Sequence, residues 1–169
     1  MIGSESTGKT SLARDLSLQF TAPWAPEFAR LYADAVGREL TTDDVENIAR
    51  GSMSMHDEME AANPELIILD TDLFSTVVYG SHYYGEVADW IEPEALKRRS
   101  DLYLLLDTDI PFESDGKQRG PALRREELQL SFREAIERHS LPFELISGNR
   151  SARMKRAISV TKSLVGLTV

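Results

Sequence analysis

The sequence predicts an α/β fold in which helices cover a parallel sheet, and three observations lead to that prediction. Residues 66–69 and 102–106 are short apolar runs, each followed by an aspartate, as in strands buried on both faces of a sheet. Segments with apolar residues at helical spacing separate these runs. A glycine-rich loop near the start of the chain leads into one such segment. Strands that alternate with helices are typical of a parallel sheet.

Length and composition fit one soluble globular domain over residues 1–169, with 41% hydrophobic and 28% charged residues. The absence of cysteine excludes disulfides and thiolate metal sites and is compatible with a cytoplasmic protein. No apolar run approaches the roughly 20 residues of a membrane span, so we expect no membrane partner. The net charge of −9 argues against nucleic acid as a partner. The sequence does not indicate the oligomeric state.

Residues 3–10 read GSESTGKT and match the phosphate-binding pattern G-x-x-x-x-G-K-[ST] at every fixed position. Such a P-loop surrounds a phosphate with backbone N–H groups, and its lysine reaches the β- and γ-phosphates. We therefore expect Lys9 to bind ATP and the Thr10 hydroxyl to bind Mg²⁺. The alternative is a serine- and glycine-rich turn that matches by chance. The expected ATP-binding residues of this segment are Gly3, Glu5, Ser6, Thr7, Gly8, Lys9, Thr10 and Ser11.

The first strand is predicted to be truncated, because only Met1 and Ile2 precede a loop that normally follows a complete buried strand. The alternative is that residues upstream of Met1 are missing from this sequence. Such a loss would expose the neighbouring strands and weaken the anchorage of the loop. A helix over about 8–20 comes next, with an apolar stripe that repeats every four residues. Two prolines then permit only a short edge strand within 22–26.

The rest of the chain predicts alternating helices and strands. A helix over 27–36 is closed by Gly37, and the capping-box spacing of Thr41 and Asp44 begins another that runs to about residue 62. Helices over 73–84 and 93–99 lie between the two apolar strands. A polar loop with two prolines and two glycines, 109–121, reads as mobile, and we place a lid at about 109–125. A helix over 122–139, a strand over 142–146 and a helix over 151–164 complete the chain.

The apolar strand that ends at Asp70 has the form of a Walker B segment, whose carboxylate holds Mg²⁺. Asp72 lies two residues further on, so both side chains would point to the same side of an extended segment. We assign Asp70 to the metal and Asp72 to the acceptor pocket. The alternative is that Asp72 caps the next helix.

Glu27 and Arg30 follow the second predicted strand, and the carboxyl ends of parallel strands line the ligand crevice. Glu27 would accept the proton of an attacking hydroxyl, and Arg30 would pair with substrate or phosphate oxygens. The alternative is an ion pair on a helix surface, worth about 0.2–0.5 kcal/mol. Their spacing alone does not separate the two interpretations.

Aromatic residues are expected around the same crevice, where they would stack on a flat cationic or heterocyclic ring. The alternative for each is core packing. The candidates are Trp24, Tyr79, Tyr83, Tyr84 and Trp90.

Three arginines, Arg119, Arg124 and Arg125, lie in and just after the predicted lid. Kinase lids use such arginines to neutralise charge on the transferred phosphoryl group. A solvated basic helix face is the alternative.

Together these motifs resemble the ribosylnicotinamide kinase domain of bacterial NadR-type NAD-salvage proteins. The resemblance covers about residues 1–148, and its most specific parts are the blocks 24–30 and 70–73. Ser4 stands where that family usually has proline. The matching segments are 3–10, 24–30, 48–51, 70–73, 101–107, 109–111 and 124–126.

The resemblance implies a P-loop NTPase three-layer sandwich of the nucleoside-kinase type, with ATP and Mg²⁺ as cofactors. It implies phosphorylation of nicotinamide riboside at its 5′-hydroxyl to give nicotinamide mononucleotide. Lys9, Glu27, Asp72 and Arg124 are then the expected catalytic residues. Glu27 or Asp72 takes the proton of the hydroxyl while the other binds the sugar, and we favour Asp72 because it adjoins the metal-binding strand end. The expected substrate-binding residues are Trp24, Glu27, Arg30, Asp72, Tyr79 and Trp90.

Two other functions stay open at this stage. One is a P-loop kinase for another nucleoside or a nucleotide. The other is a nucleotide-dependent switch, although residues 161–164 (TKSL) lack the aspartate of the usual guanine-reading motif and no other candidate for that motif occurs. A catalytically silent nucleotide-binding subunit is a third possibility.

Overall fold

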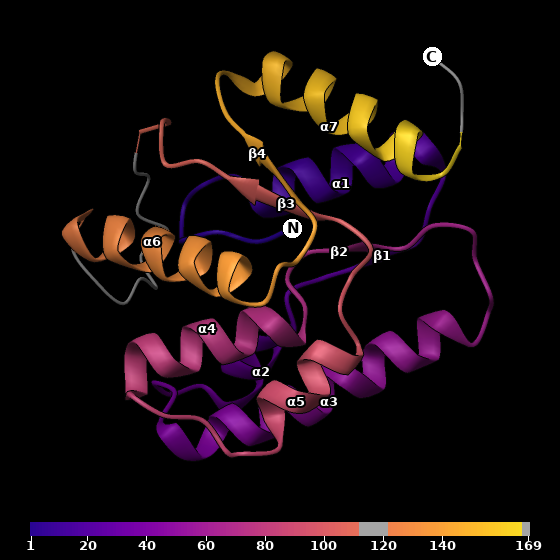
Figure 1. Cartoon of the computed structure of the whole chain (residues 1–169). Coiled ribbons are helices and arrows are strands. Elements are labelled where there is room, and N and C mark those ends of the chain that lie inside the picture. Colours follow the sequence, from indigo (N-terminus) through magenta and orange to yellow (C-terminus); the bar gives the residue numbers. More distant parts are fainter. Residues whose placement is uncertain (112–121, 167–169) are drawn as a thin grey trace.

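The computed structural model describes residues 1–111 and 122–166. Helices and strands alternate along the chain as predicted, and Figure 1 shows their arrangement. The helices are α1 (Lys9–Phe20), α2 (Phe28–Val36), α3 (Thr42–Glu60), α4 (Leu73–Tyr84), α5 (Ile91–Lys97), α6 (Ala122–Arg138) and α7 (Arg150–Leu164); the strands are β1 (Trp24–Ala25), β2 (Ile68–Leu69), β3 (Tyr103–Leu106) and β4 (Phe143–Ile146).

Two pairs of parallel strands form the sheet, β1 with β2 and β3 with β4. Met1 and Ile2 lie between the pairs. The backbone nitrogen of Met1 donates to Leu69 O at 2.6 Å, and the amide of Ile2 donates to Leu104 O at 2.9 Å. The amide of Leu106 donates to Ile2 O at 3.0 Å, and that of Thr71 donates to Met1 O at 3.1 Å. Met1 and Ile2 therefore occupy the central position in the sheet and join the two pairs of strands.

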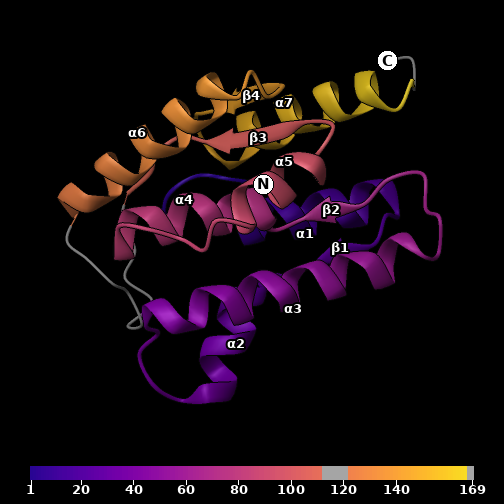
Figure 2. The same ribbon diagram turned by 60° about the horizontal axis from the view of Figure 1, so that its bottom comes forward.

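The sheet separates two apolar clusters, which gives the predicted three-layer sandwich. On one side, α1 and α7 pack over Leu104, Leu106 and Ile146. On the other side, α3, α4, α5 and α6 pack around a larger cluster that contains Phe74, Tyr103 and Phe132. Figure 1 shows α1 and α7 above the strands with α4 and α5 below them, and Figure 2 shows α2 and α3 beneath α4.

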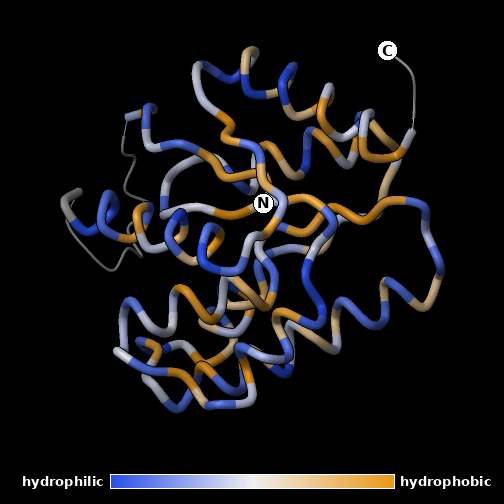
Figure 3. Tube along the Cα trace, in the orientation of Figure 1, coloured by the Kyte–Doolittle hydropathy of each residue, from blue (hydrophilic) through white to orange (hydrophobic). Residues whose placement is uncertain are grey.

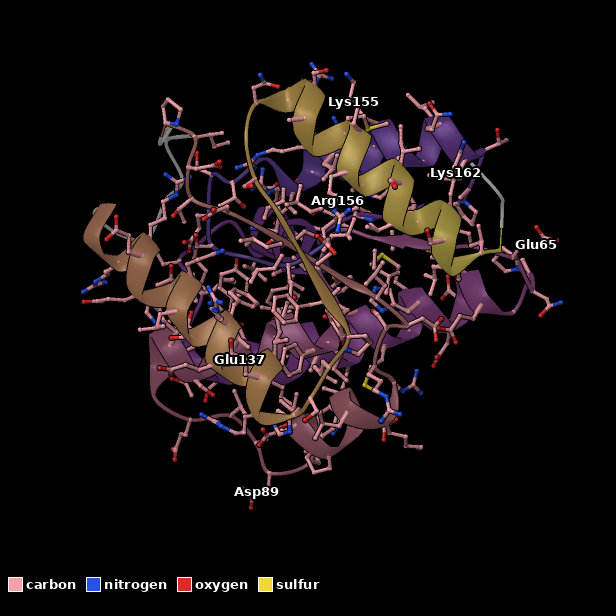
Figure 4. The ribbon with its side chains drawn as sticks, turned by 45° about the horizontal axis from the view of Figure 1, so that its top comes forward. Glu65, Asp89, Glu137, Lys155, Arg156 and Lys162 are labelled. Atoms are coloured by element: carbon pink, nitrogen blue, oxygen red, sulfur yellow. The ribbon has the colours of Figure 1, made fainter. Side chains whose placement is uncertain are left out.

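The hydropathy of the chain follows these layers. Figure 3 shows hydrophobic stretches along the central strands, whereas the helices alternate between hydrophobic and hydrophilic residues. Exposed charged side chains such as Glu137 on α6 and Lys155 on α7 lie on the outer faces in Figure 4. The amphipathic helices thus cover both faces of an apolar sheet.

Helix α4 has the predicted bounds and ends at Gly85, and Thr41 with Asp44 forms the predicted capping box of α3. Helix α5 begins at Ile91, two residues before the prediction, because Pro93 is tolerated within a first helical turn. Strand β2 has only two residues, so the predicted strand over 66–69 was too long. Of the predicted loop 109–121, residues 112–121 lie outside the described part of the chain.

Candidate active site

A cavity of about 660 Å³ lies beside the P-loop. It is lined by the loop itself, by α2 and α3, by the tyrosines of α4, by the segment after β3 and by two arginines of α7. The sequence-predicted site residues that it brings together are Glu5, Ser6, Thr7, Gly8, Lys9, Thr10, Ser11, Glu27, Arg30, Tyr79, Tyr83 and Tyr84.

The P-loop backbone requires its glycines at two positions. Gly3 has φ +127°, and a Cβ there would lie 2.8 Å from Leu106 O, so only glycine fits against β3. Gly8 has φ +84° and precedes the first residue of α1. The Thr7 hydroxyl donates to Ser4 O at 2.9 Å and closes the loop on itself. The N-terminal end of α1 therefore faces the cavity, as an anion site requires.

Lys9 is buried, and its ammonium group lies inside the P-loop. Its Nζ donates to Ser4 O at 2.7 Å, to Gly3 O at 2.9 Å and to the Tyr79 hydroxyl at 3.3 Å. Burial lowers the pKa of Lys9, and the nearby carboxylates of Glu27, Asp70 and Glu5 act in the opposite direction.

Gln129 of α6 ties the P-loop to the sheet. Its Oε1 accepts from the Ser4 amide at 3.0 Å, and its Nε2 donates to Leu106 O at 2.8 Å. The sequence analysis missed this residue, because a single glutamine on a charged helix carries no signal for a contact 125 positions away.

Arg153 of α7 is a second residue that fixes the P-loop in place and that the sequence analysis missed. Its guanidinium donates to Thr7 O at 2.6 Å, to Gly148 O at 2.8 Å and to Asp107 O at 2.9 Å, and it pairs with Asp109. The side chain is 6% exposed and lines the cavity. One buried arginine thus joins the P-loop to the segments that follow β3 and β4.

Asp70 and Thr10 are the two residues expected to hold Mg²⁺, and of these only Thr10 lines the cavity. Asp70 follows β2 and is 1% exposed, and its Oδ1 has no hydrogen-bond partner among the described residues. A buried carboxylate oxygen without a partner is costly, and a bound cation would compensate for that cost. Thr10 lies on the first turn of α1 and lines the cavity with its neighbours of the P-loop. Both residues carry the oxygen ligands that Mg²⁺ prefers.

Glu27 and Arg30 both line the cavity and also form a pair with each other. Glu27 is the N-cap residue of α2, and its Oε2 lies 3.8 Å from Arg30 Nε. The two interpretations of this spacing are therefore compatible, because the ion pair faces the cavity.

Asp72 lies elsewhere, as the N-cap residue of α4. Its Oδ1 accepts from the Ser75 amide at 3.1 Å, and its Oδ2 accepts from the Ser100 hydroxyl at 3.2 Å. The side chain is buried and is not among those that line the cavity. The geometry is that of the capping alternative, and the structure does not bring Asp72 together with Glu27.

The two tryptophans are also away from the cavity. Trp24 packs against the cluster under α1, with the Arg14 guanidinium 4.8 Å from its ring centroid. Trp90 packs against the other cluster, with the Arg50 guanidinium 4.6 Å from its ring centroid. The structure therefore does not bring the two tryptophans together at this cavity, since each packs in a different apolar layer. The tyrosines of α4 alone supply the predicted aromatic wall.

The lid arginines are only partly within the described chain. Arg119 lies outside it, and Arg124 is exposed and does not line the cavity. Arg125 is buried and donates to Ile110 O at 3.0 Å and to Ser6 O at 3.2 Å, and burial lowers the pKa of its guanidinium. It thus contacts the P-loop directly, through a backbone carbonyl of the loop.

Comparison with known proteins agrees with this geometry. Residues 1–153 match the family described as AAA domain. No described helix has the length and apolar character needed to cross a membrane.

Two curated relatives are the trifunctional NAD biosynthesis/regulator proteins NadR of Escherichia coli and Salmonella typhimurium. Each is 24% identical over 172 residues, which is 98% of this chain but 42% of the relative. The chain thus spans less than half of either protein.

Two solved structures share the fold. A NadR protein in complex with NR has a TM-score of 0.74 and 23% identity, over 99% of this chain and 51% of its own. A NadR protein in complex with NAD and AMP-PNP has a TM-score of 0.72 and 22% identity, over 99% of this chain and 49% of its own.

Proposed function

The chain belongs to the AAA-domain family, and on that premise we propose that it is an ATP-dependent kinase that phosphorylates nicotinamide riboside to nicotinamide mononucleotide. The observation that carries the proposal is the single cavity shared by the P-loop and by the carboxylate of Glu27. A phosphoryl donor and an acceptor hydroxyl must lie in one site for direct transfer. The related NadR structures with NR and with AMP-PNP support the choice of acceptor and of nucleotide.

At the donor end, the P-loop amides and Lys9 would hold the β- and γ-phosphates of ATP. Phosphoryl transfer needs positioning and neutralisation of charge more than covalent chemistry from the protein. The N-terminal end of α1 adds a favourable field for the phosphates. Arg119, Arg124 and Arg125, within a lid at about 109–125, would add positive charge near the transferred group.

Thr10 and Asp70 would hold Mg²⁺, which neutralises charge on the phosphate oxygens when bound. The buried and unpartnered Asp70 Oδ1 supports this assignment.

At the acceptor end, Glu27 would accept the proton of the ribose 5′-hydroxyl as its oxygen bonds to the γ-phosphorus and the bond to ADP breaks. We favour Glu27 over Asp72 for this role, because Glu27 lines the cavity whereas both oxygens of Asp72 are engaged by the protein. Arg30 would orient Glu27, and Tyr83 and Tyr84 of α4, which line the same cavity, would contact the nicotinamide ring.

The test is an ADP-release assay with nicotinamide riboside, with each common nucleoside and without acceptor, combined with mass spectrometry of the product. We expect ADP and nicotinamide mononucleotide in equal amounts with nicotinamide riboside. Faster turnover with another nucleoside or a nucleotide would identify that compound, and not nicotinamide riboside, as the acceptor. Turnover that does not depend on any acceptor would favour a nucleotide-dependent switch and would refute a kinase.

A further inference from the structure

We propose that the Tyr79 hydroxyl is a positioning group for Lys9 and the P-loop, rather than part of a platform for the acceptor ring. The inference concerns the donor half of the site and rests on the proposed kinase function. It assigns to Tyr79 a role in transfer that differs from stacking on the acceptor.

Tyr79 reaches the P-loop from a distant part of the chain. Its hydroxyl donates to Gly3 O at 3.0 Å and accepts from Lys9 Nζ at 3.3 Å. Gly3 is also the residue whose carbonyl accepts from Lys9, so the three groups form a closed triangle of hydrogen bonds. A side chain of α4 thus contacts both the lysine and the backbone that carries it.

The direction of these hydrogen bonds follows from chemistry. An ammonium group has only donors, and a carbonyl oxygen has only lone pairs, so the phenol must donate to Gly3 and accept from Lys9. Burial raises the pKa of Tyr79 well above its usual value, as do the carboxylates of Glu27 and Glu5, so the phenol stays neutral. The hydroxyl is therefore a fixed acceptor that helps to define where the ammonium lies.

Packing around the ring of Tyr79 fixes the position of its hydroxyl. It packs edge-on against Phe132 of α6, with ring centroids 5.3 Å apart, and stacks on Tyr83 with centroids 6.3 Å apart and an interplanar angle of 7°. Tyr83 in turn donates to Glu5 of the P-loop. Because the ring is held by Phe132 and Tyr83 while the hydroxyl contacts both Lys9 and Gly3, we assign the main role of Tyr79 to its hydroxyl.

Two substitutions of Tyr79 separate the two roles. Tyr79→Phe keeps the ring and removes the hydroxyl, whereas Tyr79→Leu removes both. If the hydroxyl positions Lys9, Tyr79→Phe should lower kcat about tenfold, since a hydrogen bond to a charged group is lost, and should leave the KM for nicotinamide riboside within about twofold. An unchanged kcat in Tyr79→Phe, with a raised acceptor KM only in Tyr79→Leu, would overturn the proposal in favour of stacking.

A binding measurement tests the same idea without any acceptor. AMP-PNP carries the β- and γ-phosphates that Lys9 reaches, and AMP does not. We expect Tyr79→Phe to weaken AMP-PNP binding about threefold to tenfold and to leave AMP binding unchanged. Equal losses for both nucleotides would refute action through Lys9. If the wild-type protein does not phosphorylate nicotinamide riboside, the proposed function fails, yet this measurement still decides the role of Tyr79.

A double-mutant cycle with Lys9→Met completes the test. In the Lys9→Met background, Tyr79→Phe should change AMP-PNP affinity much less than in the wild type, because the group it positions is gone. Additive effects would overturn the proposal. Tyr32→Phe is the matched control: the Tyr32 hydroxyl donates to Asp44 at 3.0 Å and does not line the cavity. It should leave both nucleotide affinities unchanged, and circular dichroism should show that every variant is folded.

Discussion

The carboxylate of Asp72 accepts a hydrogen bond from the backbone N–H of Ser75 at 3.1 Å, within the first turn of α4. The Ser75 hydroxyl approaches the same oxygen at 3.3 Å, and Ser100 occupies the other oxygen. The first N–H groups of a helix have no partner within the helix, so this contact stabilises the start of α4. Asp72 therefore caps its helix through its side chain, whereas the side chain of Glu27 makes no capping hydrogen bond to α2.

This difference predicts that the isosteric substitutions of Glu27 and Asp72 lower kcat to very different extents. Glu27→Gln should lower kcat about 10²–10⁴-fold, the usual contribution of a general base. Asp72→Asn should lower kcat far less, because an amide oxygen can still cap the helix. Steady-state kinetics on folded protein measures both. A larger loss of kcat in Asp72→Asn than in Glu27→Gln would indicate that Asp72, and not Glu27, is the general base.

We expect His56 on α3 to make folding stability depend on pH. The residue is 8% exposed, and its Nε2 has no hydrogen-bond partner in the described chain. Burial lowers its pKa and Arg98 acts in the same direction, while Asp72, Glu60 and Asp57 partly oppose the shift. The unfolded chain therefore binds a proton more readily than the folded protein.

The free energy of unfolding should accordingly fall as the pH drops below about 6.5, the usual pKa of histidine. Urea unfolding between pH 7 and pH 5 measures this dependence, and His56→Gln should give a shallower slope. The other two histidines are present in both proteins, so their contributions cancel in the comparison. Equal slopes would mean that His56 does not contribute to the pH dependence.

Gly51 on α3 leaves room for the ring of Phe28. A Cβ at position 51 would lie 2.0 Å from Phe28 Cζ, so Gly51→Ala must displace this ring, which lines the cavity. We expect the acceptor KM to rise severalfold. The melting temperature should change little, because the helix propensity gained, about 1 kcal/mol, offsets part of the 1–3 kcal/mol typical of overpacking. Ser54→Ala on the exposed side of α3 is the control, and an acceptor KM that matches it would contradict the prediction.

Arg153 should be the most costly side chain to remove from α7. Arg153→Leu would leave three backbone carbonyls and Asp109 without their partner, and losing one member of a buried pair costs about 3–5 kcal/mol. Arg156→Leu is the matched control, because its pair with Glu144 is more than half exposed on the arginine side and worth about 0–1 kcal/mol. Urea unfolding of both variants measures the difference. Similar losses would show that the buried network adds nothing beyond a surface pair.

Local signals predicted the elements that begin and end with distinctive residues. Helix α4 lies between a capping aspartate and Gly85, and α3 begins with a capping box, so their bounds were readable from the sequence. The P-loop was equally clear, because its spacing is a chemical requirement of phosphate binding. The AAA-domain match and the shared fold of the NadR structures agree with that prediction.

The rest of the site depends on contacts between distant parts of the chain. Gln129 and Arg153 hydrogen-bond to the P-loop from more than 120 positions further along the chain. The residues next to them in the sequence carry no pattern that predicts these contacts. The tryptophans lie away from the cavity for the related reason that an aromatic residue near a strand end can enter either apolar layer. Asp72 does not line the cavity beside the P-loop, because two-residue alternation holds only in an extended chain, whereas Thr71 has φ +72° and turns the backbone between the two aspartates.

The position of Met1 and Ile2 in the sheet has a consequence for local stability. Met1 and Ile2 form a seam between two halves of the sheet, and the P-loop begins at the very next residue. Amide protons along this seam, those of Ile2, Thr71 and Leu106, should therefore exchange with solvent through local opening more readily than those inside α4. A nucleotide bound at the loop would be linked to the closed seam by mass action and would slow that exchange. Nucleotide binding at the phosphate site would thus stabilise the contact between the two halves of the sheet.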